Sequence, residues 1–425
     1  MNASAAVLLT NPQPFASTAQ AALQLRVYQE ISDLQDLRPA WDDLLSKYPL
    51  ATTFSTWEWL TCWWRAFGGN RQHLVLCAFD ESNSLIGLAP FSLGHERHSG
   101  VSLRILRMMG DGSFDSDNLD LPVVPGFEEA FAQSVIWYLN KEKSHWDLCE
   151  LNTLPVDSPA ASHLSRLAKV RRWAFSESFT ASSAIQLPAT WDAYLAMLSS
   201  EDRKNLPRYT RRLQNRHAMR IYRCDANTFP ECLESLYRLH QARWESVGEA
   251  GSFSSAQRRN FYWELSCSLL KRGWLELWVL ELDSETVAVQ FAFRYGDRVF
   301  QLQEGYDHRR SSDRPGYVLR GEVLKTLIRE GVRVYDFLGG EDQYKARWAA
   351  QPGMYRTIRF APRLSKGGIL LQIRSNAGAG KQWLRCNLPK AAWGVLHDVN
   401  AAVGRLRHPP TSAPRLADIR TPRAE

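Results

Sequence analysis

Residues 299–348 read VFQLQEGYDHRRSSDRPGYVLRGEVLKTLIREGVRVYDFLGGEDQYKARW, and this stretch decides the fold that the sequence predicts. A strand ending at Tyr306 is followed by a basic loop, and the Pro315-Gly316 step then opens an apolar-periodic helix. A second strand runs to Asp336. This order predicts a βαβ unit whose loop lies between a strand's carboxyl end and a helix's amino end, a place where anions bind.

The same order of elements occurs twice in the chain. Each half has two helices, a β-hairpin, a third strand, a loop, a helix and a further strand, and WDLCEL at 146–151 corresponds to VRVYDFLGG at 332–340. A repeat at a spacing of about 200 residues predicts a duplicated domain with a boundary near Pro188. We expect a disordered N-terminus at 1–22, followed by an N-terminal domain at 23–188. A C-terminal domain with the donor site is expected at 189–362, and a basic tail with a possible helix at 363–425.

Composition indicates an ordinary globular protein, because 44% of the 425 residues are hydrophobic and 23% are charged. The net charge of +7 lies entirely in residues 366–425, which hold ten Lys or Arg against three acids. The body is therefore neutral. We expect a solubilising or loosely docked tail, while a weak tail contact with an anionic membrane or nucleic acid stays open.

The cysteines and the N-terminus favour a cytoplasmic location. The seven cysteines form no CxxC pair, which is typical of reduced thiols rather than a disulfide scaffold or zinc site. Residues 1–17 lack the features of a signal peptide, and no apolar run reaches the roughly 18 residues of a membrane span. The oligomeric state is not indicated.

Five segments carry a family resemblance: TFSTWEWLTCWWRAFGG (53–69), SLIGLAPFSL (84–93), RILRMMGDGSFDSDNLDLPVVPG (104–126), SSEDRKNLPRYTRRL (199–213) and YDFLGGEDQYKARW (335–348). They resemble the GNAT acyltransferase superfamily, and more closely the CelD/BcsL-like acetyltransferases linked to cellulose or exopolysaccharide synthesis. Fem-type aminoacyltransferases are similar in having tandem GNAT halves. The resemblance implies an α/β (α+β) fold of two tandem GNAT-like domains with mixed, mostly antiparallel sheets. It also implies acyl transfer, with acetyl-CoA as donor and no metal, to a polar acceptor such as a saccharide or cell-envelope precursor.

The basic loop is the expected donor site. Guanidinium groups and backbone N–H groups at a helix start bind phosphates. The candidates are Arg309, Arg310, Arg314, Gly316, Tyr317 and Val318. The loop keeps one glycine and lacks the second glycine of the usual GNAT pattern, (Gln/Arg)-x-x-Gly-x-(Gly/Ala). The alternative is a solvated turn whose arginines point outward.

The catalytic candidates are two tyrosines and three carboxylates. Tyr344 is the first choice for the acid that protonates the leaving thiolate, and Tyr306 is the second. Asp336, Glu304 and Glu341 are candidate general bases. Each tyrosine is equally well read as a packing aromatic, and Asp336 as a cap of the next turn.

Acceptor binding is expected between the halves, because the first half has no basic loop at the equivalent position. The candidate residues are Lys345, Arg347, Trp348, Asp115 and Asp117. The aspartates belong to an acidic loop that fails the EF-hand pattern, so a polar turn or acceptor-side loop is favoured over a metal site.

Three other patterns are read as structural. The basic segment 200–216 is expected to be a solvated helix or groove wall, since no nucleic-acid-binding signature accompanies it. The tryptophan-rich helix at 54–67 is expected in the core rather than stacked on sugars. Residues 377–382 lack the full P-loop pattern.

Two rival functions remain. A Fem-type enzyme would use aminoacyl-tRNA as its donor. A non-catalytic scaffold with a decayed donor site would explain the missing glycine.

Overall fold

The computed structural model describes residues 7–10, 23–98, 100–113, 115–246, 248–340 and 343–375. Residues 1–371 form one unit, to which the elements below belong. The predicted disordered N-terminus, apart from 7–10, and the tail beyond 375 with its expected helix lie outside the described residues. No helix among the described residues is long and apolar enough to cross a membrane.

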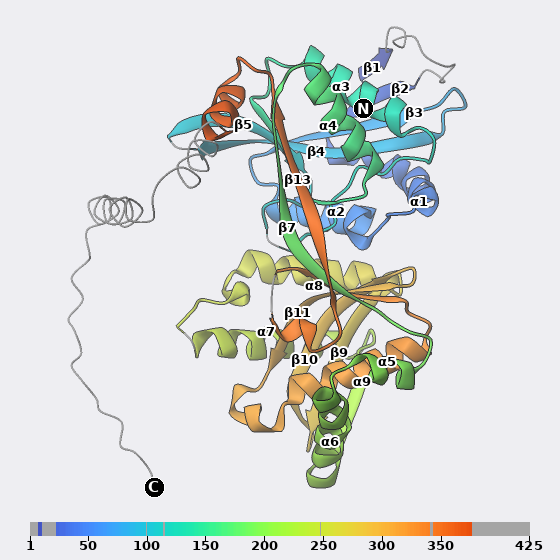
Figure 1. Ribbon diagram of the computed structural model, residues 1–425, viewed down its shortest axis with the longest axis vertical. Helices are drawn as coiled ribbons and strands as arrows, with labels where there is room; N and C mark the ends of the chain where they lie inside the picture. Colours follow the sequence, from blue (N-terminus) through green and yellow to red (C-terminus); the bar gives the residue numbers. More distant parts are fainter. Residues whose placement is uncertain are drawn as a thin grey trace, which may run out of the picture. The chain divides into compact units, whose positions relative to one another are not determined.

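One mixed sheet connects the strands of both halves (Figure 1). Its strands, in chain order, are β1 Val7–Thr10, β2 Gln24–Tyr28, β3 Gln72–Phe79, β4 Leu85–His98, β5 Val101–Met108, β6 Leu148–Pro155, β7 Ala174–Gln186, β8 Met219–Arg223, β9 Leu275–Leu282, β10 Glu285–Tyr295, β11 Arg298–Tyr306, β12 Val334–Gly339 and β13 Gln351–Ala361. Their order in the sheet is β1-β2-β3-β4-β5-β6-β13-β7-β12-β11-β10-β9-β8. Within the described chain, neighbours are antiparallel except β5–β6 and β11–β12, so the predicted mixed and mostly antiparallel α/β fold is confirmed.

The sheet crosses the boundary expected near Pro188. Strand β13 comes from the end of the second half, yet it pairs with β6 and, along its own whole length, with β7. The two long strands run side by side in Figure 1. Strand β7 also pairs with β12, so β7 and β13 join the two halves through backbone hydrogen bonds.

Helices cover the sheet on both faces. Their bounds are α1 Arg38–Lys47, α2 Trp57–Phe67, α3 Glu128–Lys141, α4 Pro159–Val170, α5 Trp191–Met197, α6 Ser200–Arg216, α7 Phe229–Glu245, α8 Ala256–Lys271, α9 Pro315–Arg329 and α10 Gln343–Ala346. Helix α2 of the first half packs against α8 of the second. Trp59 and Trp63 of α2 are fully buried, which confirms the predicted core role of this helix.

Local sequence explains the elements around the second half's βαβ unit. The β9–β10 hairpin turns at Asp283 and Ser284, whose φ values of 52° and 69° suit a two-residue turn. Helix α6 is capped at its start by Ser199, whose hydroxyl accepts the Asp202 N–H. Gly321 lets α9 approach α6, because a Cβ there would lie 2.4 Å from a methyl of Leu206.

Candidate functional site

Strands β11 and β12 pair only over their first residues. Their parallel register runs from Arg298↔Val334 to Phe300↔Asp336 and then ends. Just beyond, Leu302 is an extra residue in β11 relative to β10, which forms a bulge. The two strands therefore stop pairing before their carboxyl ends, next to the start of α9.

A cavity of about 270 Å³, here called the strand-end cavity, lies at this place. Eight residues predicted from sequence line it: Glu304, Tyr306, Arg314, Gly316, Tyr317, Tyr344, Arg347 and Trp348. The structure adds Ser311 and Arg320. Arg320 was missed, although an arginine within the apolar run of α9, between Leu319 and Val323, was a visible signal.

Arg320 forms the interior of the strand-end cavity. It is 4% exposed and ion-pairs with Glu304. Its guanidinium lies 5.3 Å from the ring centroids of Phe337 and Tyr344 and 5.4 Å from that of Trp348. Burial alone would lower the pKa of Arg320, but the Glu304 carboxylate together with Tyr335 and Tyr344 outweighs burial, so the pKa of Arg320 is raised. Glu304 is therefore the counter-ion of Arg320, and its role as a candidate general base stays a prediction.

Two further guanidiniums line the cavity. Arg314 has left-handed backbone angles (φ 53°, ψ 50°), and its guanidinium lies 5.0 Å from the Tyr209 ring centroid. Arg347 donates to Asp202 over 2.6 Å. Since its carboxylate accepts from Arg347 and two hydroxyls, Asp202 has a lowered pKa despite the opposing effect of burial.

The other two loop arginines do not line the strand-end cavity. Arg309 Nε donates to Asp307 over 2.9 Å, and Arg310 ion-pairs with Glu285 at 2.8 Å. Glu285 belongs to the β9–β10 hairpin, which draws both side chains to that side. The predicted phosphate role of Arg309 and Arg310 is thus replaced by ion pairing within the loop.

The backbone of the α9 start is also used internally. The N–H groups of Tyr317 and Val318 both donate to the Arg314 carbonyl over 3.1 Å. The left-handed turn at Arg314 directs this carbonyl into the first helical turn. These two predicted phosphate donors are therefore already hydrogen-bonded, which leaves the guanidinium groups as the predicted phosphate ligands.

Asp336 lies on the opposite face of β12 from the strand-end cavity. Tyr335 and Phe337 pack toward the core beneath α9, so the alternation of a strand turns Asp336 to the other side. Its carboxylate accepts the Leu338 N–H over 2.8 Å and lies 3.8 Å from Arg298. Burial raises the pKa of Asp336 to about 6. Asp336 and Tyr344, predicted to act together, therefore border different cavities.

The acidic loop 111–120 links the halves rather than presenting free carboxylates. Asp115 is 2% exposed and accepts from Arg258 Nε (3.0 Å) and from the Tyr262 hydroxyl (2.9 Å). Asp117 accepts the Gly339 N–H over 2.9 Å. Burial raises the pKa of both aspartates. Their expected acceptor-binding role is corrected to a structural one, and no metal-binding cluster occurs among the described residues.

Lys345 is likewise structural. It is 4% exposed, and its Nζ donates to the carbonyl oxygens of Gly339 (2.8 Å), Gly340 (3.1 Å) and Phe337 (3.4 Å). These carbonyls end strand β12, so Lys345 holds the strand terminus rather than an anionic acceptor.

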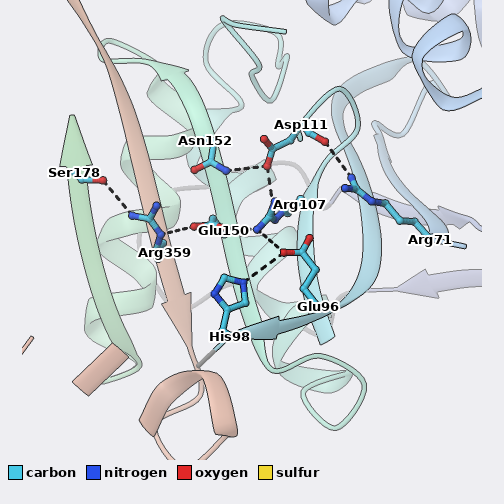
Figure 2. A network of polar contacts seen from close by, with 9 residues as sticks. All are labelled: Arg71, Glu96, His98, Arg107, Asp111, Glu150, Asn152, Ser178 and Arg359. Atoms are coloured by element: carbon cyan, nitrogen blue, oxygen red, sulfur yellow. Dashed lines mark hydrogen bonds and ion pairs between the residues drawn. The ribbon is translucent and has the colours of Figure 1, made fainter. Parts of the chain in front are cut away.

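The first half has ion pairs near the corresponding place. Strands β5 and β6 also pair in parallel over only two residues. Figure 2 shows Arg107 of β5 between Glu150 of β6 and Glu96 of β4, at 2.7 and 3.0 Å, with Asp111 held by Asn152 at 2.8 Å. Charged side chains therefore tie these strands together, whereas in the second half a cavity lies beside the carboxyl end of β11.

Residues 200–346, which include eight of the ten residues that line the strand-end cavity, match the model of an acetyltransferase (GNAT) domain. No curated protein matches the sequence of the chain. The structure of FemX is 11% identical, with a TM-score of 0.56 over 79% of this chain and 98% of that one, which shows a shared fold.

Two other solved structures resemble the chain less. A conserved protein of unknown function from Bacteroides thetaiotaomicron is 13% identical, covering 76% of this chain and 97% of its own, with a TM-score of 0.47. The C-terminal domain of a putative lysylphosphatidylglycerol synthetase from Agrobacterium fabrum is 10% identical, covering 80% and 96%, with a TM-score of 0.46.

Proposed function

We propose, from the GNAT domain matched at residues 200–346, that the chain is an acyl-CoA-dependent N- or O-acyltransferase. Acetyl-CoA is the proposed donor, and the acceptor is a polar molecule such as a saccharide or a cell-envelope precursor. The observation that carries the proposal is the strand-end cavity, where guanidiniums and aromatic rings meet between the end of β11, the start of α9 and the residues of and after α10. Free thiols at the six described cysteines support the cytoplasmic location expected for an acyl-CoA enzyme.

The residues present suit part of an acyl-CoA. Arg314 and Arg347 would pair with its phosphates, because guanidinium groups bind phosphate oxygens in a bidentate manner, and Arg347 would then share its guanidinium with Asp202. Tyr317 and Trp348, with ring centroids 4.7 Å apart, offer an apolar wall for the chain that follows. A bound thioester supplies the activated acyl group. Tyr344, 40% exposed at the cavity, is the proposed donor of a proton to the leaving thiolate, with Tyr306 as the second candidate.

Calorimetry with acetyl-CoA tests the donor site. We expect Arg314→Ala to weaken binding at least about tenfold, since a hydrogen bond to a charged group contributes about 1.5–3 kcal/mol. Arg309→Ala is the matched control. It lies in the same loop but pairs with Asp307, so its affinity should stay within about twofold of the unaltered protein. Absence of binding at millimolar acetyl-CoA would refute the proposal. An equal loss of affinity for acetyl-CoA in both variants would mean that the phosphates bind elsewhere.

An aminoacyl-tRNA donor is the second candidate, and one observation favours it. Arg208 and Arg212 of α6 lie 5.1 Å from the Tyr209 ring centroid, which Arg314 also approaches. This group of guanidiniums next to the cavity would suit a polyanion longer than CoA. Competition between acetyl-CoA and aminoacyl-tRNA separates the two donors, and binding of neither would favour a non-catalytic scaffold.

A further inference from the structure

Helix α6 carries three exposed cations along one side, here called the α6 stripe. They are Lys204, Arg208 and Arg211, and their spacing of four and then three residues places them on one side of a helix. Other cations of this helix are paired, since Arg212 and Arg216 both lie within ion-pair distance of Asp313. The three cations of the stripe form no ion pair with a carboxylate among the described residues. Their charge is therefore available to a partner.

The α6 stripe reaches the strand-end cavity through Arg208. The guanidiniums of Arg208 and Arg314 lie 5.1 and 5.0 Å from the centroid of the same Tyr209 ring, and Arg314 lines the cavity. Neither guanidinium forms an ion pair within the part of the chain that the structure describes. Because like charges this close repel each other, an anion bound beside them would lower the free energy.

The rest of the α6 stripe lies on the side of the helix that faces away from α9. Leu206 and Tyr209 pack against Gly321 and the first turn of α9. Each residue turns an α-helix by about 100°, so residues two positions apart point about 200° away from each other. Lys204 is two positions from Leu206, and Arg211 is two positions from Tyr209. A partner that contacts the whole stripe must therefore be larger than a ligand seated in the cavity.

The strand-end cavity is large enough for only part of an acyl-CoA. Its volume of about 270 Å³ lies below the roughly 300–1,000 Å³ of pockets that enclose drug-sized ligands. Its residues suit the phosphate and the thioester arm, with Arg314 for the phosphate and the rings of Tyr317 and Trp348 beside the arm. This phosphopantetheine arm is the part that coenzyme A has in common with acyl carrier proteins, which are small and acidic.

We propose that the α6 stripe docks a small acidic protein that carries an acyl group on a phosphopantetheine arm, and that the arm enters the strand-end cavity. The proposal rests on the function proposed above, and it names the form in which the donor arrives. Carboxylates at steps of three and four on a helix of the partner would match the stripe. In the transfer, the bond between the acyl carbon and the sulfur of the arm breaks as the bond to the acceptor nitrogen or oxygen forms. The proton that the acceptor loses ends on the thiol sulfur.

A nucleic acid is the other polyanion that a basic helix could bind, and the α6 stripe suits a protein better. Single strands are held by stacking bases on exposed aromatic rings, whereas Tyr209, the aromatic residue of α6, is only 9% exposed. The stripe spans about 10 Å of helix, so it would contact few phosphates, and the body of the chain adds no net positive charge.

Calorimetry with an acetylated acyl carrier protein tests the docking. We expect binding that weakens with added salt. Lys204→Glu combined with Arg211→Glu should weaken it at least about tenfold, because like charges then face each other. The same variant should bind acetyl-CoA within about twofold of the unaltered protein, since neither residue lines the cavity. The matched control is Lys143→Glu combined with Arg171→Glu, the same charge change at two exposed sites of the first half, and it should bind the carrier protein normally.

Four results would overturn part or all of the proposal. Absence of carrier binding, or an equal loss in the two double variants, would refute docking on the α6 stripe. Equal affinity for a carrier protein without its arm would refute entry of the arm into the cavity. Binding of transfer RNA that needs Lys204 and Arg211, without carrier binding, would assign the stripe to nucleic acid.

Acetyl-CoA and S-acetyl-phosphopantetheine separate this proposal from the acyltransferase function. Binding of these two small donors without binding of the carrier protein overturns only the docking. Binding of the carrier protein when neither small donor binds overturns the acyltransferase, and the α6 stripe would then be a docking face for an acidic protein without transfer.

Discussion

Replacing Asp336 by Asn is expected to make the protein more stable at alkaline pH. Burial raises the pKa of this carboxyl from its ordinary 3.8 to about 6, so the folded state holds the proton more tightly than the unfolded chain. The contribution of the Asp336 carboxyl to the free energy of unfolding is fully present below pH 3.8, and it is lost as the pH rises through 6. Asn removes the buried charge while keeping the acceptor for Leu338.

The magnitude follows from the shift of about two pKa units, each equal to about 1.4 kcal/mol. Asp336→Asn should therefore gain about 3 kcal/mol at pH 8 and about half of that at pH 5. Urea unfolding, followed by tryptophan fluorescence at both pH values, measures the two differences. If Asp336→Asn were instead less stable than the unaltered protein by the same amount at pH 5 and pH 8, the reasoning would be refuted. Asp336 would then stabilise the fold mainly by packing or hydrogen bonding.

Three further predictions concern buried groups. Glu304→Gln should destabilise the protein by about 3–5 kcal/mol in urea unfolding because Arg320 stays buried without its counter-ion, and adding Arg320→Met should recover most of the loss. Asp115→Ala should cost a similar amount by leaving Arg258 unpaired, and hydrogen exchange should rise in α8; unchanged exchange would contradict a link between the halves. Trp63→Ala, at a fully buried site, should cost about 3–5 kcal/mol, and a loss below about 1 kcal/mol would contradict the core assignment of α2.

Much of the fold was predictable because its signals are local. Turn residues such as Asp283 and Ser284 predict a hairpin, and apolar residues at helical spacing predict that α2 packs in the core. The strand–loop–helix–strand order at 299–348 likewise predicted the parallel pair β11–β12. These features depend on residues only a few positions apart.

The predicted donor loop shows where local reasoning stops. The basic loop was found from sequence, and Arg314 does line the strand-end cavity. Arg309 and Arg310 do not, because Asp307 holds Arg309 and Glu285, 25 positions earlier in the chain, holds Arg310. Charge count alone does not show which partner an arginine meets.

The sequence by itself thus determined the duplicated order of elements, the βαβ unit and most of the residues around the strand-end cavity. Only the tertiary structure decided that β13 returns to pair with β6, that Asp115 meets Arg258 across 143 positions, and that Asp336 borders a different cavity from Tyr344. The physical reason is that pairing between distant strands, and the face to which a strand turns each side chain, are set by packing of the whole chain rather than by neighbours in sequence.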